Sequence, residues 1–112
     1  MKPKIPPIIQ VAMKWLEKHY ITEPYEDVGA ADKRWAAYTI NNIYVDLHDH
    51  EACVWTVDIV GRTPHINAPS SIIERTIPYD NPEFYSKLAA AIKEVHLIDQ
   101  EIAPYRYDIT EP

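Results

Sequence analysis

The stretch WAAYTINNIYVDLH, residues 35–48, decides the fold, because two runs of alternating apolar residues meet at Asn41–Asn42. Asparagine tolerates the positive φ that a two-residue type I′ turn requires. Pairing across this turn collects one apolar face, with Ile40 opposite Ile43, Tyr38 opposite Val45 and Ala36 opposite Leu47. The other face pairs Thr39 with Tyr44, Ala37 with Asp46 and Trp35 with His48. The pattern predicts a β-hairpin, and one long strand through both asparagines is the alternative.

The residues after this hairpin predict a third strand that pairs with its second arm. Cys53, Trp55, Val57 and Ile59 alternate as an apolar face. We expect them to meet the first hairpin through the pairs Leu47–Cys53, Val45–Trp55 and Ile43–Val57, with His48 across from Ala52 and residues 49–51 as the turn. This register directs Cys53 into the core. It leaves Tyr44, Asp46, Val54, Thr56 and Asp58 on the outer face.

A helix is predicted at each side of this strand region. The first begins at Pro6 or Pro7, where a missing N–H costs nothing, and ends near Tyr20. Its expected stripe is Ile8, Val11, Ala12, Trp15 and His19, flanked by Ile9, Met13, Leu16 and Tyr20. The second opens with Asp80 or Asn81 as N-cap and Pro82 in its first turn. Its expected buried stripe is Phe84, Leu88, Ala91, Ile92 and Val95.

The remaining segments connect these elements or end the chain. Residues 21–33 and 61–70 are rich in turn-forming residues and are predicted as loops. Residues 71–78, SIIERTIP, predict a fourth short strand with Ile73 and Ile77 on one side. Residues 1–5 and 103–112 are expected to be extended termini. The whole chain, 1–112, is therefore predicted to be one α+β domain: an antiparallel meander of four strands (three to five), with an N-terminal and a C-terminal helix packed on one face.

Composition excludes several classes of function. The net charge is −6, and the basic residues form no cluster beyond Lys33–Arg34, so no nucleic-acid partner is expected. No apolar run approaches the roughly 20 residues of a membrane span. With only two glycines, the chain has no phosphate-cradling loop, and no cofactor is expected. The single cysteine is typical of a reducing compartment, which predicts a cytoplasmic protein.

The segment DLHDHEAC, residues 46–53, is the richest in chemically active groups. His48 and His50 alternate and could join Asp46 or Glu51 around a divalent metal. An acid–base pair of His48 with Asp46 or Asp49, or of Asp58 with Glu74, is a second hypothesis. Neither has a remote supporting motif, so we interpret the segment as a solvated hairpin tip. No catalytic residue and no resident metal are assigned, and Cys53 is expected to be an inert apolar side chain.

Three classes of function stay open. The preferred one is a non-enzymatic interaction protein, such as an adaptor, inhibitor or immunity-type factor of microbial or phage origin, bound to a protein partner or to itself as a homodimer. Its candidate contact residues are Tyr44, Val54, Thr56, Tyr105, Arg106 and Tyr107, because tyrosine and arginine are enriched at interface anchors. The alternatives are a small metal- or histidine-dependent enzyme using Asp46, His48 and His50, and a small-ligand module whose pocket lies beside Trp35 or Trp55.

Overall fold

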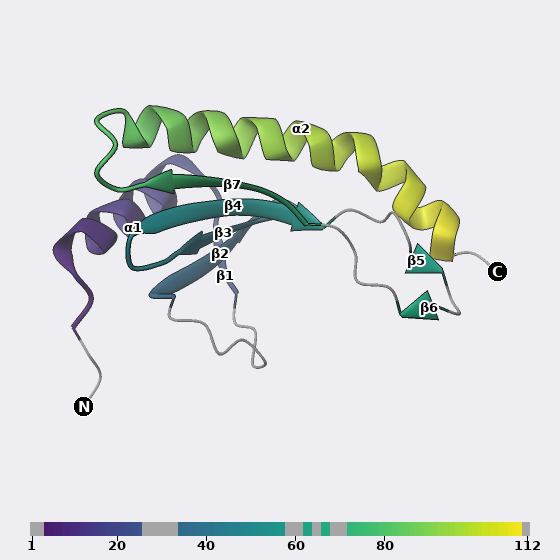
Figure 1. The fold of residues 1–112 in the computed structure, drawn as a ribbon, viewed down its shortest axis with the longest axis horizontal. Helices are drawn as coiled ribbons and strands as arrows, with labels where there is room; N and C mark the ends of the chain where they lie inside the picture. The colour runs from purple at the N-terminus through teal and green to yellow at the C-terminus, as the bar shows by residue number, and fades with distance from the viewer. Residues whose placement is uncertain (1–3, 26–33, 58–61, 64–65, 68–71, 111–112) are drawn as a thin grey trace.

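The protein is an α+β fold in which one antiparallel sheet carries both helices on a single face (Figure 1). This computed structural model describes residues 4–25, 34–57, 62–63, 66–67 and 72–110, with side chains described outside 62–63, 66–67 and 103–110. The helices are α1 (Pro7–His19) and α2 (Phe84–Thr110). The main sheet contains β1 (Glu23–Pro24), β2 (Ala36–Ile40), β3 (Ile43–Leu47), β4 (Glu51–Val57) and β7 (Ile72–Pro78), in that spatial order. The predicted fold class is confirmed.

Two short strands outside the main sheet pair only with each other. They are β5 (Arg62–Thr63) and β6 (Ile66–Asn67), and both fall within the stretch predicted as a loop. Strand β1 likewise lies inside the predicted loop 21–33, where it adds a short edge to β2. Residues 26–33, 58–61, 64–65 and 68–71 lie outside the described part of the chain. In the described helices, none is both long enough and apolar enough to cross a bilayer.

The first hairpin has the predicted register. Ile40 pairs with Ile43, Tyr38 with Val45 and Ala36 with Leu47. Five of these side chains are buried in the core, and Ala36 is partly buried against it. The turn type differs from the prediction, because Asn41 has a φ of 56° and is the one non-glycine residue with positive φ in the described backbone. A type I′ turn needs positive φ at both central residues, whereas a type II′ turn needs it at the first alone. The sign pattern is therefore that of a type II′ turn.

The predicted register of β3 with β4 is wrong by one residue. Leu47 pairs with Ala52 and Asp46 with Cys53, because His48 and Glu51 close the hairpin around the two residues Asp49 and His50. Since side chains alternate along a strand, this shift turns all of β4 over. Small residues then face the helices: Ala52 and Val54 are fully buried and Thr56 is 1% exposed.

The chemistry of the two faces explains the reversed strand. Helix α2 lies along β4 and β7 (Figure 1), and small side chains beneath it permit close approach. The polar hydroxyl of Thr56 is tolerated there because it donates to Asp99 Oδ1 of α2 at 2.7 Å. Cys53 and Trp55, which the apolar alternation assigned to the core, instead lie on the face away from the helices.

Helix α2 has the predicted buried stripe and continues beyond it. Phe84, Leu88, Ala91, Ile92 and Val95 are all buried in the core. Asn81 caps the start, since its Oδ1 accepts a hydrogen bond from the Glu83 N–H at 2.9 Å. The helix extends to Thr110, so the prediction of an extended segment from residue 103 is wrong through residue 110.

Helix α1 has the predicted bounds but a different buried stripe. Ile9, Ala12 and Leu16 are fully buried, whereas Ile8 and Val11 are about half exposed. Trp15 lies between the helices, with its ring centroid 5.1 Å from that of Tyr85. The broad apolar arc of α1 allows either stripe to face the sheet, and tertiary packing buries the one that runs through Ile9, Ala12 and Leu16.

Candidate functional site

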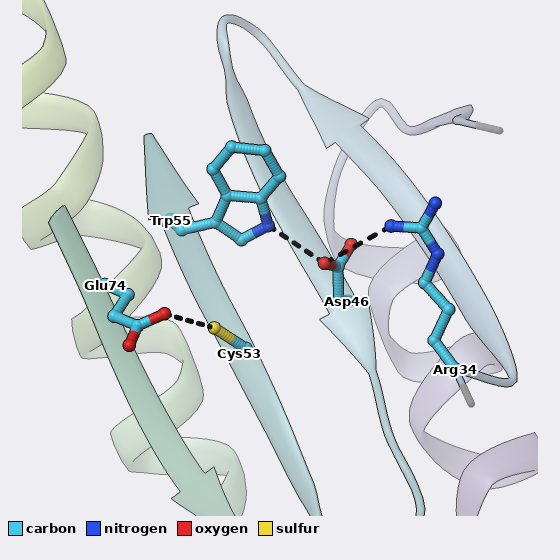
Figure 2. Close-up of polar contacts among 5 residues, drawn as sticks. All are labelled: Arg34, Asp46, Cys53, Trp55 and Glu74. Carbon is cyan, nitrogen blue, oxygen red and sulfur yellow. Dashed lines mark hydrogen bonds and ion pairs between the residues drawn. The ribbon is translucent and has the colours of Figure 1, made fainter. Parts of the chain in front are cut away.

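The sheet has a second face, which points away from both helices. We define it by the residues that alternate with the buried ones on the three strands that carry most of it: Tyr44 and Asp46 of β3, Glu51, Cys53 and Trp55 of β4, and Glu74 and Thr76 of β7. Among the described residues, no helix packs on this face. Figure 2 looks onto it, with the helices behind the strands. Any chemistry of this face comes from side chains that neighbouring strands bring into one plane.

Three aromatic rings form a continuous row across the second face. The rings of Tyr44 and Trp55 stack at 4.2 Å between centroids with an interplanar angle of 19°. Tyr25, which follows β1, lies 5.0 Å from Tyr44. The pairing of Tyr44 with Trp55 across β3 and β4 creates the stack, and offset stacking of this kind is favourable. We call Tyr25, Tyr44 and Trp55 the aromatic row.

Asp46 is a buried carboxylate at the edge of the aromatic row. Its Oδ2 accepts a hydrogen bond from Trp55 Nε1 at 2.9 Å and lies 3.5 Å from Arg34 Nη1 (Figure 2). The Arg34 guanidinium also lies 5.6 Å from the ring centroid of Tyr25. Both contacts of Asp46 use the same oxygen, and within the described part of the chain Oδ1 has no hydrogen-bond partner. The cluster therefore contains a buried carboxylate oxygen, Asp46 Oδ1, that can accept a further hydrogen bond beside the aromatic row.

A shallow hollow of about 350 Å³ lies next to this cluster, at the closed end of the β3–β4 hairpin. It is lined by His48, Asp49, His50, Glu51, Cys53, Glu74 and Thr76, and we call it the acidic hollow. Tyr79 fixes the hairpin tip, because its hydroxyl donates to the His48 carbonyl at 2.6 Å and its N–H to the His50 carbonyl at 3.2 Å. One wall of the acidic hollow is thus a hydrogen-bonded turn that carries the carboxylates of Asp49 and Glu51.

Cys53 forms the floor of the acidic hollow together with Glu74. The thiol donates to Glu74 Oε2 at 3.6 Å (Figure 2). Burial, followed by the charge and hydrogen bond of Glu74, raises the pKa of Cys53 to about 12. A nucleophilic cysteine needs the opposite setting, with a lowered pKa in a positive environment. The predicted inertness of Cys53 stays a prediction, but its predicted direction, into the helix-covered core, is wrong.

The structure separates the residues of the metal hypothesis. His48 and His50 both line the acidic hollow, whereas Asp46 is engaged by Trp55 and Arg34. Within the described part of the chain, no group of three or more His, Cys, Asp or Glu side chains is placed to hold a metal ion. Of the acid–base pairs, His48 and Asp49 share the hollow, and Asp58 lies outside the described residues.

The predicted contact residues lie in different parts of the structure. Tyr44 belongs to the aromatic row as expected from its face. Val54 and Thr56 are buried under α2, so their predicted exposure is wrong and they form no part of an interaction surface. Tyr105, Arg106 and Tyr107 lie within α2, where only the backbone is described.

Sequence reasoning did not single out Tyr25 and Arg34, which complete the cluster around Asp46. Tyr25 lies within the predicted loop 21–33 and Arg34 directly follows it, and no periodicity connects them to the sheet. A signal for Trp55 existed, because a buried indole N–H needs an acceptor and Asp46 is the nearest acid on the neighbouring strand. That signal was outweighed by the apolar alternation of residues 53–59.

Comparison with known proteins adds no assignment. The chain matches no protein-family model, and comparison with curated proteins and with solved structures gave no match.

Proposed function

We propose that this protein is a non-enzymatic binding module that captures a basic segment of a protein partner on its second face. The observation that carries the proposal is the junction of the aromatic row with the acidic hollow. Tyrosine and tryptophan supply large contact areas with little loss of side-chain freedom, which makes them frequent anchors of protein interfaces. The adjoining carboxylates give that surface a preferred sign of charge.

Charge complementarity points to a cationic partner. Five carboxylates lie on or around the second face in the described residues: Glu23, Asp46, Asp49, Glu51 and Glu74. They are opposed there by the guanidinium of Arg34. Lysine and arginine side chains pair with carboxylates and also stack on tyrosine and tryptophan rings. An arginine-containing segment therefore matches both halves of the surface, and the net charge of −6 favours its approach.

The chemistry of the same face supports binding rather than catalysis. The Cys53 thiol has a raised pKa, and the Asp46 carboxylate is tied to Trp55 and Arg34. We further propose that the protein works in the cytoplasm, where its single thiol stays reduced. A protein of microbial or phage origin that acts as an adaptor or inhibitor remains our preferred class, with self-association through the same face as the competing outcome.

The test uses the full chain and two synthetic peptides of equal length, one with arginine alternating with serine and one with glutamate in place of arginine. We expect saturable binding of the arginine peptide. The binding is measured by the changes in ¹H–¹⁵N chemical shift at Glu51, Cys53, Trp55 and Glu74. Glu74→Lys should weaken it at least about tenfold, or 1.4 kcal/mol. Glu101→Lys, an equal change of net charge on exposed α2, should leave it unchanged.

Three results would reject the proposal. The first is a lack of saturable binding of the arginine peptide. The second is an equal loss of affinity in Glu74→Lys and Glu101→Lys, since that indicates attraction to net charge alone. The third is a dimer that dissociates when Tyr44 is replaced by Glu while the peptide has no effect on it, because the second face is then a self-association surface.

A further inference from the structure

A separate cavity of about 170 Å³ lies on the helix side of the sheet, remote from the second face. Three elements meet there: the turn of the β2–β3 hairpin, the residue that follows α1, and the middle of α2. The lining residues are Tyr20, Ile40, Asn41, Ile43, Ala89, Ile92, Lys93 and His96, which we call the helix-side cavity. A space of roughly 150 Å³ is enough to hold a benzene ring in a protein interior. The cavity therefore has room for a small molecule.

The floor of the helix-side cavity is apolar. Ile40, Ile43 and Ile92 are each at most 4% exposed and belong to the main core. They present branched alkyl surface with no polar atom, which suits the body of a hydrocarbon or aromatic group. A ligand seated on this floor gains from burial of its apolar part.

The polar side chains that line the helix-side cavity are those of Tyr20, Asn41, Lys93 and His96. His96 Nδ1 is buried and has no hydrogen-bond partner among the described residues. Lys93 lies one turn before His96 on the same side of α2, and its charged end reaches solvent. Burial raises the pKa of the Tyr20 hydroxyl, which favours its neutral form. None of the lining residues is acidic. The lining of the cavity therefore suits an anionic ligand, although the chain as a whole carries a net charge of −6.

We infer that the helix-side cavity binds a small organic carboxylate with an apolar body. The apolar part rests on Ile40, Ile43 and Ile92, the carboxylate pairs with the Lys93 ammonium, and it accepts from His96 Nδ1 in the tautomer that carries the proton on that nitrogen. A buried polar atom without a partner costs free energy, and a charged acceptor at hydrogen-bond distance removes that cost. The inference is independent of the proposed peptide-binding face.

The experiment titrates the ¹⁵N-labelled full chain with benzoate, and separately with benzamide and benzylamine, which keep the ring and change the charge. We expect saturable shifts with benzoate at Asn41, Ala89, Lys93 and His96. Benzamide and benzylamine should each bind at least about tenfold more weakly, because they lack the anion.

Variants identify the separate contributions of Lys93 and His96. Lys93→Glu should reduce benzoate affinity at least about tenfold. Lys87→Glu reverses an exposed charge on α2 outside the cavity and should leave the affinity unchanged. His96→Phe keeps an aromatic ring and should reduce the preference for benzoate over benzamide, since Lys93 remains. Far-ultraviolet circular dichroism and thermal unfolding establish that each variant is folded.

Several outcomes overturn the inference. Benzoate and benzamide binding equally well would leave an apolar pocket with no anion site. An absence of shifts with every ligand would mean that the cavity holds only water. Equal losses of benzoate affinity in Lys93→Glu and Lys87→Glu would show that the effect comes from the overall electrostatic field of α2 and not from a contact in the cavity.

Discussion

Trp55 donates its indole N–H to Asp46 on the neighbouring strand, across 2.9 Å, on the face of the sheet that carries no described helix. The bond links a half-buried aromatic ring to a carboxylate that is 7% exposed. It also explains why β4 presents its largest side chain away from the core: the indole N–H finds an acceptor there, and small residues are left to pack under α2. The second face is therefore an ordered polar and aromatic surface.

Removal of this bond should destabilise the fold. Trp55→Phe takes the donor at 2.9 Å from a buried carboxylate whose other contact, Arg34, lies at 3.5 Å. We expect the free energy of unfolding to fall by about 1–3 kcal/mol, measured by urea denaturation. Trp35→Phe is the matched control, because the bond from its indole to Asp49 is exposed. Equal losses in the two variants would contradict the role assigned to Asp46.

The reactivity of Cys53 should depend on Glu74. With the thiol pKa raised to about 12, the native protein should react with a disulfide reagent far more slowly at neutral pH than the urea-unfolded chain. Glu74→Gln removes the negative charge at 3.6 Å and should increase the native rate several-fold. Glu101→Gln, on α2, serves as the control. A native rate unaffected by Glu74→Gln would show that burial alone protects the thiol.

Stability should decline at alkaline pH. The pKa of Cys53 rises from 9.0 to about 12, and that of Tyr38 from 10.0 to about 12, through burial first and then through neighbouring carboxylates. The folded state then holds protons that the unfolded chain releases above about pH 9, so raising the pH favours unfolding up to about pH 12. Urea midpoints measured across this range should fall steadily. The double variant Cys53→Ser, Tyr38→Phe should fall less, and a flat wild-type profile would refute the assignment.

The β2–β3 turn should respond to substitution according to backbone preference. Asn41 has a φ of 56°, and glycine adopts this conformation without the steric cost of a Cβ. Asn41→Gly should therefore be neutral or slightly stabilising. Asn41→Val should cost about 1–2 kcal/mol, since a β-branched residue disfavours positive φ. Thermal unfolding of both variants beside Asn42→Val tests this, because positive φ is confined to Asn41 in this turn. Equal effects at the two positions would contradict the turn geometry.

The sequence by itself determined those features that rest on local patterns. The pair Asn41–Asn42 between two alternating runs specified the first hairpin and its register, because one turn length satisfies both apolar faces. The spacing of Phe84, Leu88 and Val95 specified the buried side of α2, since it repeats over several turns. Together they were enough for the α+β class.

Tertiary structure decided the features for which two local solutions were almost equal. A two-residue and a three-residue turn after His48 differ by one position, and that difference inverts β4. The close approach of α2 and the hydrogen bonds of the Trp55 and Thr56 side chains selected the shorter turn. The same packing chose Ile9 over Ile8 on α1. The candidate sites depend on these choices, because each gathers side chains that are distant in sequence and become neighbours only when the sheet and helices pack together.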